Sequence, residues 1–160
     1  MKTLFSFIII CSLSLSAYSQ KQLNNFDEIM TSLKNGKSVK TVIYYAKCKL
    51  FADGKEEPES PNAIGGMRID TYEYFDASIF KGKAPSCLVS SQTVLVSHPK
   101  YGYVYNYVKI KVRKDNSVEI IARYLKPRLL SKKYKIIMDE TFKGSLKSNE
   151  NDGGISFFEE

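Results

Sequence analysis

The sequence predicts a mainly β protein of the α+β class. An antiparallel meander of about seven strands should form a bent sheet or a barrel, with one short N-terminal helix packed on it. Three observations support this. The stretch 26–33 carries apolar residues at helical spacing, later stretches alternate apolar and polar residues, and short polar links join them. The 160 residues suffice for one domain and are too few for two ordinary ones.

Residues 1–19 have the pattern of a cleaved signal peptide. Lys2 supplies a positive charge, and the stretch 4–15 is apolar but too short to span a membrane. Small residues precede the cleavage position that we predict after Ser19. We therefore expect one mature domain over 20–160, in the periplasm or secreted, without a membrane-spanning segment.

The first element expected in the mature domain is an amphipathic helix. Its apolar stripe consists of Phe26, Ile29, Met30 and Leu33. Asn25 is a favourable N-cap, and Glu28 follows three residues later, as in a capping box. Gly36 suits the left-handed position that ends a helix. A helix of about ten residues is not stable alone, so it must pack on another element.

Strands are predicted over 39–48, 67–75, 88–97, 101–112, 117–125, 134–146 and 155–158. The stretch 39–48 is apolar at nearly every step, which predicts a central strand covered on both faces, with the helix on one of them. The polar stretch 53–62 contains two prolines and is expected to be a loop.

A hairpin is predicted around residues 114–116. A three-residue turn pairs Val112 with Val118 and Lys111 with Glu119, whereas a two-residue turn would set Val112 against a glutamate. We therefore predict the three-residue turn, with Asn116 able to take a positive φ.

The odd positions of the stretch 101–113 supply the candidate binding residues, which are Tyr101, Tyr103, Lys109, Lys111 and Arg113. Aromatic rings stack on sugars or bases, and cations hold phosphate or carboxylate. The same residue types also suit the plain solvent face of a sheet. The net charge of +7 favours anionic partners. The partners considered are an anionic glycan, a lipid headgroup or a host protein, and an exported protein is not expected to bind nucleic acid.

Cys48 and Cys87 are the cysteines that remain after removal of the signal peptide. In an oxidising compartment two thiols most simply form a disulfide. The alternative is a free Cys48 that acts as a nucleophile, with His98 as its base. No sequence motif for a metal, a phosphate loop or a nucleophile elbow occurs, so neither a cofactor nor a metal is predicted.

The stretch 26–48 resembles the VirK family of exported bacterial proteins. The features are an L-x-x-G-K helix end at 33–37, a valine-rich strand and the sequence A-K-C at 46–48. Weaker similarity continues through the glycine pair 65–66, the hairpin and L-K-P at 125–127, and the glycine and aromatic strand at 154–158. The resemblance implies a virulence- or host-associated protein and no catalytic residues.

One departure from the VirK pattern concerns the cysteines. The resemblance implies a second cysteine near Gly144 and Ser145, where this chain has none. Cys87 is present instead, so either the disulfide has moved or Cys48 is free.

We therefore predict a non-enzymatic binding or accessory role at the cell envelope or the host interface. One alternative is a lipocalin-like carrier, whose sign would be a closed barrel around an apolar cavity. Another alternative is a thiol-dependent enzyme that uses Cys48.

Overall fold

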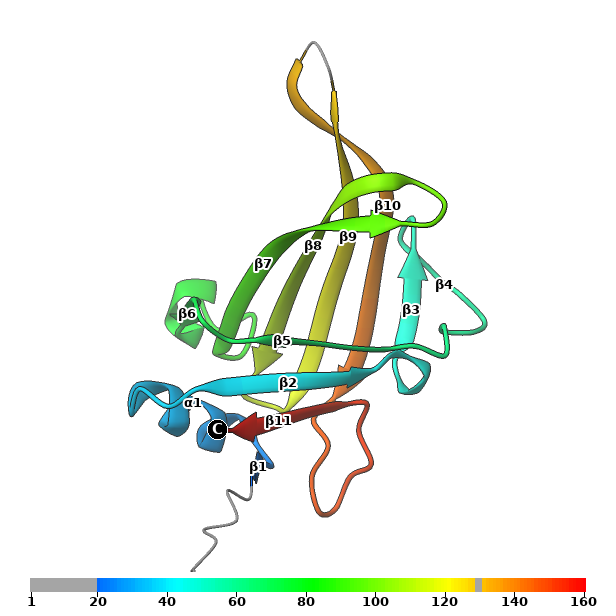
Figure 1. Cartoon of the computed structure of the whole chain (residues 1–160). Helices are drawn as coiled ribbons and strands as arrows, with labels where there is room; N and C mark the ends of the chain where they lie inside the picture. Colours follow the sequence, from blue (N-terminus) through cyan, green and yellow to red (C-terminus); the bar gives the residue numbers. More distant parts are fainter. Residues whose placement is uncertain (1–19, 129–130) are drawn as a thin grey trace, which may run out of the picture.

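A computed structural model describes residues 20–128 and 131–160, which form two antiparallel sheets and one α-helix (Figure 1). The predicted signal peptide lies outside the described residues. The mainly β prediction with one N-terminal helix is confirmed. Within the described part of the chain, no helix is long and apolar enough to cross a membrane.

The larger sheet has seven strands and the smaller has four. In spatial order, the larger sheet contains β4 (Lys55–Glu56), β3 (Lys49–Ala52), β10 (Ser131–Ser145), β9 (Ser117–Arg128), β8 (Gly102–Arg113), β7 (Cys87–His98) and β6 (Tyr72–Phe75). The smaller sheet contains β1 (Lys21–Leu23), β11 (Ile155–Glu159), β2 (Val39–Tyr44) and β5 (Ile64–Arg68). Figure 1 shows the smaller sheet lying across one end of the larger, whose hairpins extend away from it.

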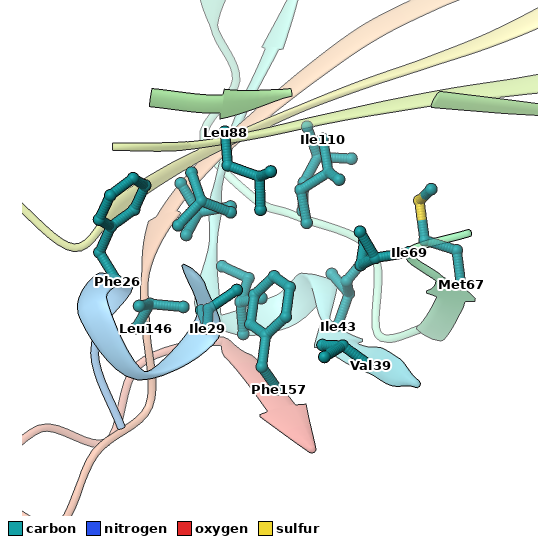
Figure 2. Close-up of a cluster of buried hydrophobic side chains, with 14 of the residues drawn as sticks. Phe26, Ile29, Val39, Ile43, Met67, Ile69, Leu88, Ile110, Leu146 and Phe157 are labelled. Carbon is teal, nitrogen blue, oxygen red and sulfur yellow. The ribbon is translucent and has the colours of Figure 1, made fainter. Parts of the chain in front are cut away.

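The hydrophobic core lies where the two sheets and the helix meet. Phe157 and Ile43 from the smaller sheet face Leu88 and Ile110 from the larger one, and all four are fully buried (Figure 2). Ile29 of the helix closes the side of this cluster. Because one core serves both sheets, neither sheet has an apolar interior of its own at this end.

The helix α1 (Phe26–Lys34) has the predicted ends. The Asn25 side chain accepts a hydrogen bond from the Glu28 N–H at 2.9 Å. After the helix, Gly36 has a φ of 71°, and the N–H of Lys37 donates to the Ser32 carbonyl. This hydrogen bond is typical of a Schellman motif, which satisfies the last carbonyls of a helix.

The predicted three-residue turn between β8 and β9 is confirmed. Val112 lies opposite Val118 and Lys111 lies opposite Glu119. Asn116 has a φ of 65°. Its side-chain oxygen also accepts a hydrogen bond from the Phe26 N–H at 2.8 Å, so the turn holds the start of the helix.

Two predicted strands are shorter than expected. The strand over 39–48 ends at Tyr44, because a 3-10 turn at Tyr45–Lys47 redirects the chain into the larger sheet. Only one face of β2 is buried, since Val42 and Tyr44 on the other face remain partly exposed. The prediction that both faces are covered was therefore wrong.

The stretch 67–75 was predicted as one strand and is two. It begins in β5 of the smaller sheet and ends in β6 of the larger sheet. Between them, Ile69 is buried in the core and its N–H donates to the Val39 carbonyl. Apolar and polar residues therefore alternate without a break although the chain passes from the smaller sheet to the larger one. Three short strands, β1, β3 and β4, were not predicted.

The sequence left open whether the strands form a sheet or a barrel. Both sheets have free edges, formed by β4 and β6 in the larger sheet and by β1 and β5 in the smaller one. The described strands therefore form open sheets. The closed barrel that the lipocalin-like alternative requires is absent from them.

Candidate functional site

The five predicted binding residues fall into two separate groups. Tyr103 is 72% exposed near the hairpin between β7 and β8, with Tyr101 just before it. Lys109, Lys111 and Arg113 lie toward the other end of β8. Six residues of strand separate Tyr103 from Lys109, which corresponds to about 20 Å. The structure therefore does not gather the five residues into one site.

The three cations of β8 already have partners or acidic neighbours. Arg113 forms an ion pair with Glu119 at 3.0 Å, and the Lys111 ammonium lies 5.8 Å from the centre of the Phe80 ring. Lys109 lines a shallow hollow together with Glu73. These contacts compensate part of the positive charge that the sequence places there.

A different region has exposed apolar side chains on one face of the strands and exposed cations on the other. We call it the distal surface, because it lies at the end of the larger sheet farthest from the core. Its apolar and aromatic residues are Leu95, Tyr103, Tyr134 and Ile136, the two lysines on the opposite face are Lys126 and Lys135, and Lys100 lies in the turn between β7 and β8. The sequence carries a signal for it that we did not use, since no acidic residue occurs in 77–114 or 120–138.

Two lysines of the distal surface lie directly opposite each other. Lys126 on β9 faces Lys135 on β10, and the Lys126 ammonium lies 3.5 Å from the Tyr101 carbonyl oxygen. Like charges in opposite positions of a sheet are destabilising. A partner with negative charge would remove that cost.

A second pair of opposed lysines in the same sheet differs from the pair Lys126 and Lys135. Lys49 faces Lys143 at the other end of the sheet. There, Lys49 forms an ion pair with Glu56 at 2.9 Å, and the Lys143 ammonium lies 4.3 Å from the centre of the Phe51 ring. Side chains of the protein compensate this pair, whereas neither Lys126 nor Lys135 forms an ion pair with an acidic side chain in the part of the chain that the structure describes.

The proposed base His98 belongs to the tip of the hairpin between β7 and β8. Its ring stacks on Tyr101 at 4.8 Å, and its Nδ1 accepts hydrogen bonds from the N–H groups of Lys100 and Tyr101. About 30 Å of strand separates this tip from the level of Cys48. The Cys48–His98 pair required for thiol catalysis is therefore not assembled.

The predicted disulfide between Cys48 and Cys87 is not formed in the structure, where both cysteines are buried free thiols. Cys48 immediately precedes β3 and Cys87 begins β7, with β10, β9 and β8 between these strands. Four strand spacings amount to about 19 Å, and a disulfide requires Cα atoms within about 7 Å of each other.

The Cys48 thiol lies in a close-packed position. A Cβ atom added at Gly144 or Gly154 would approach its sulfur to 3.0 or 2.9 Å. Burial raises the pKa of the Cys48 thiol, which disfavours the reactive thiolate. These observations describe a packed structural cysteine.

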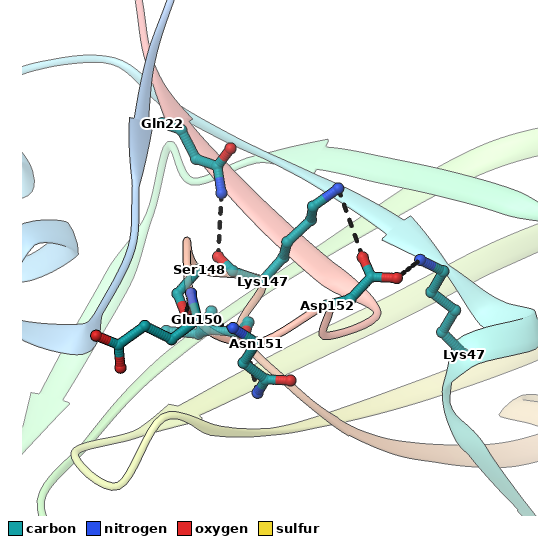
Figure 3. Close-up of polar contacts among 8 residues, drawn as sticks. Gln22, Lys47, Lys147, Ser148, Glu150, Asn151 and Asp152 are labelled. Carbon is teal, nitrogen blue, oxygen red and sulfur yellow. Dashed lines mark hydrogen bonds and ion pairs between the residues drawn. The ribbon is translucent and has the colours of Figure 1, made fainter.

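The chain after β10 is fastened by polar contacts around Asp152 (Figure 3). Its carboxylate accepts a hydrogen bond from the Lys47 ammonium at 2.6 Å and lies 3.6 Å from the Lys147 ammonium. Gln22 donates to the Lys147 carbonyl at 3.1 Å. These contacts hold the segment that covers Cys48 and lower the pKa of Asp152, chiefly through the Lys47 hydrogen bond.

A concave hollow of about 280 Å³ opens on the inner face of the larger sheet, beside the core. Its floor and walls come from β8, β9, β10, β5 and the 3-10 turn at Tyr45–Lys47. The lining residues are Tyr45, Pro61, Ala63, Ile64, Gly65, Asn106, Val108, Ala122, Tyr124, Met138, Glu140 and Phe142.

Glu140 is the charged residue in that lining. Burial raises the pKa of its carboxyl, and no cation among the described residues opposes this effect. Burial also raises the pKa of Tyr45, and the negative charges of Cys48, Tyr124 and Glu140 in their ionised forms act in the same direction. This hollow could not be predicted from the sequence, because its residues come from widely separated stretches.

No group of three or more acidic, histidine or cysteine side chains within residues 20–128 and 131–160 is arranged to hold a metal ion. The candidate sites are therefore the distal surface and the concave hollow. Both contain aromatic and apolar side chains, with lysines at the distal surface and Glu140 in the hollow.

Comparison with known proteins gives a family match and a structural match. The model of the VirK family, described as VirK protein, matches residues 22–129. The crystal structure of a VirK family protein from Legionella pneumophila is similar, with a TM-score of 0.59 and 16% sequence identity over 86% of this chain and 98% of that chain. At this identity the similarity concerns the fold. No curated protein matches the chain.

Proposed function

Because the chain belongs to the VirK family, we propose that it is an exported, non-enzymatic accessory protein that binds an anionic surface outside the cytoplasm. Its location is periplasmic or secreted, after cleavage following Ser19. The anionic groups that it recognises are phosphates, carboxylates or sulfates on a lipid or glycan surface. The buried Cys48 thiol and the remote His98 support a role without catalysis.

The observation that carries this proposal is the opposed pair Lys126 and Lys135 at the end of the hairpin, where the other face of the same strands has exposed aromatic and aliphatic side chains. Cations near an anionic membrane surface contribute about 1 kcal/mol each. Tyr103 and Tyr134 have the amphipathic rings that favour interfaces between an apolar and a polar phase. Of the predicted residues, Tyr103 belongs to the distal surface and Tyr101 contacts Lys126 of it, whereas Lys109, Lys111 and Arg113 lie outside it.

A binding experiment with two charge-matched variants tests the proposal. Lys126→Gln/Lys135→Gln and Lys49→Gln/Lys143→Gln remove the same charge from opposite ends of one sheet. Binding would be measured to phosphatidylcholine vesicles with and without phosphatidylglycerol, and to immobilised heparin. We expect the distal variant to weaken binding by about 30-fold, from about 2 kcal/mol for two cations, and the Lys49/Lys143 control to bind nearly as the wild type does.

The two probes separate a lipid surface from a glycan surface. Retention should decrease with added salt, because exposed charges are screened within about 10 Å at 0.1 M. Equal losses in both double variants would indicate a general charge effect and contradict the proposal. Absence of binding to both vesicles and heparin would also contradict it.

A further inference from the structure

We propose that the concave hollow binds a small organic cation, an ammonium or guanidinium group, with the Glu140 carboxylate as its counter-ion. None of the residues of the distal surface lines this hollow. The proposal therefore goes beyond the anionic-surface function and does not depend on it.

The first support is the unpaired negative charge. Glu140 lies next to Asp139 on β10, but their side chains point to opposite faces. Asp139 accepts a hydrogen bond from Arg123 at 2.8 Å. Glu140 is half-buried, and no cation is present in the lining of the hollow. Buried charges in proteins are normally paired, so an unpaired carboxylate in a hollow indicates a place for an external cation.

The second support is the aromatic wall beside this carboxylate. The Tyr45 ring packs on the buried Phe142 ring with centroids 4.5 Å apart, and Tyr124 lines the same hollow. A Cβ atom at Gly65 would lie 2.9 Å from the Tyr45 ring, so glycine at this position lets the ring lie against β5. Tyrosine faces attract cations within about 6 Å.

The third support is the shape of the hollow. Val108, Ala122 and Met138 give it an apolar floor, suited to the methyl or methylene groups of an organic cation. Asn106 and the tyrosine hydroxyls add hydrogen-bonding groups at its edge. A volume of about 280 Å³ is at the small end for ligand pockets, which favours a small cation over a lipid or a long peptide.

The charge requirement is tested with a matched ligand pair. Choline and its uncharged carbon analogue 3,3-dimethylbutan-1-ol have nearly the same shape, and methylguanidinium provides the second cationic head group. Each would be titrated into the mature protein, with binding followed by amide chemical shifts. We expect saturable binding of choline or methylguanidinium at the hollow and at least tenfold weaker binding of the neutral alcohol.

Two variants assign the charge to Glu140. Glu140→Gln keeps the shape of the side chain and should weaken binding of the cation at least tenfold. Glu73→Gln removes an exposed carboxylate on the outer face and should leave the affinity unchanged. The proposal is overturned if neither cation binds, if the neutral alcohol binds equally well, or if Glu140→Gln retains the wild-type affinity for the cation. A Tyr45→Leu variant should also reduce the affinity, because it removes the ring face.

Discussion

Glu140 shows how the position of a single residue on a strand decides its chemistry. Its neighbour Asp139 forms an ion pair with Arg123 on the outer face at 2.8 Å. Glu140 itself points into the concave hollow, where burial raises the pKa of its carboxyl. Because side chains alternate along a strand, these two neighbouring carboxylates point to opposite faces and do not form a close pair.

The raised pKa of Glu140 predicts a pH-dependent stability difference from Glu140→Gln. The folded protein holds this proton more tightly than the unfolded chain, so the wild type loses stability as the pH rises above the ordinary glutamate pKa of about 4.3. The glutamine variant has no carboxyl at this position, so its stability does not decrease for this reason. We therefore expect its free energy of unfolding, relative to the wild type, to be higher at pH 7 than at pH 4.

Urea denaturation of both proteins at the two pH values measures this difference. The pKa values of the neighbouring Tyr45 and Cys48 are raised, so both groups remain protonated in this range and are common to both proteins. A difference that is unchanged between pH 4 and pH 7, or that has the opposite sign, would contradict the assigned burial of Glu140.

At the scale of elements, the contact between β10 and the chain entering β3 explains the environment of Cys48. The resemblance to the VirK family implied a second cysteine near Gly144, and the structure places the Cys48 sulfur beside that glycine. A Cβ atom at position 144 would lie 3.0 Å from this sulfur. In a disulfide with an S–S bond of about 2.05 Å, the Cβ atom of one cysteine also lies about 3.0 Å from the sulfur of the other.

We therefore expect Gly144→Cys to form a disulfide with Cys48 under mild oxidation. The new Cβ atom approaches Ile155 Cδ1 to 2.7 Å, so the end of that side chain must move. The cross-link closes a long loop and should raise the free energy of unfolding by about 2 kcal/mol. Thiol titration of the denatured, unreduced protein should find Cys87 as the free cysteine of the mature chain.

Gly144→Ser provides the control for this cross-link, because it adds a side chain of similar size that forms no disulfide. Two free thiols, from Cys48 and Cys87, should then remain. Three free thiols in oxidised Gly144→Cys would contradict the position assigned to Cys48.

At the scale of the whole molecule, one core joins the two sheets. Phe157 on β11 is fully buried among side chains from both sheets, whereas the next residue, Phe158, points to the other face and is half-buried. The two sheets should therefore unfold together, since neither retains a core when the other is lost.

Phe157→Ala tests this shared core. Truncation of a buried phenylalanine costs about 3–5 kcal/mol, a large share of the 5–15 kcal/mol that stabilises a typical domain. We expect one cooperative transition at much lower denaturant, with circular dichroism and tyrosine fluorescence coinciding. Phe158→Ala should have a smaller effect. Separate transitions by the two probes would contradict a single core.

Much of the local structure was predictable because its causes lie close together in the sequence. The helix was predicted from its apolar stripe, its N-cap residue and the glycine that ends it. The register of β8 and β9 was predicted by pairing Val112 with Val118 across a short turn. The break of the stretch 67–75 was not predictable, because Ile69 continues the alternation while the chain changes sheets. The candidate binding residues on β8 stay a prediction, and their separation into two groups depends on strand geometry.

The sequence by itself determined the mainly β class, the helix, the hairpin turn and the family, since these depend on residues near one another or on a linear motif. The tertiary structure decided which strands share a sheet, and therefore that Cys48 and Cys87 lie about four strand spacings apart. It also brought Tyr45, Tyr124 and Glu140 around one hollow. Such groupings depend on long-range packing, for which a single sequence carries no local signal.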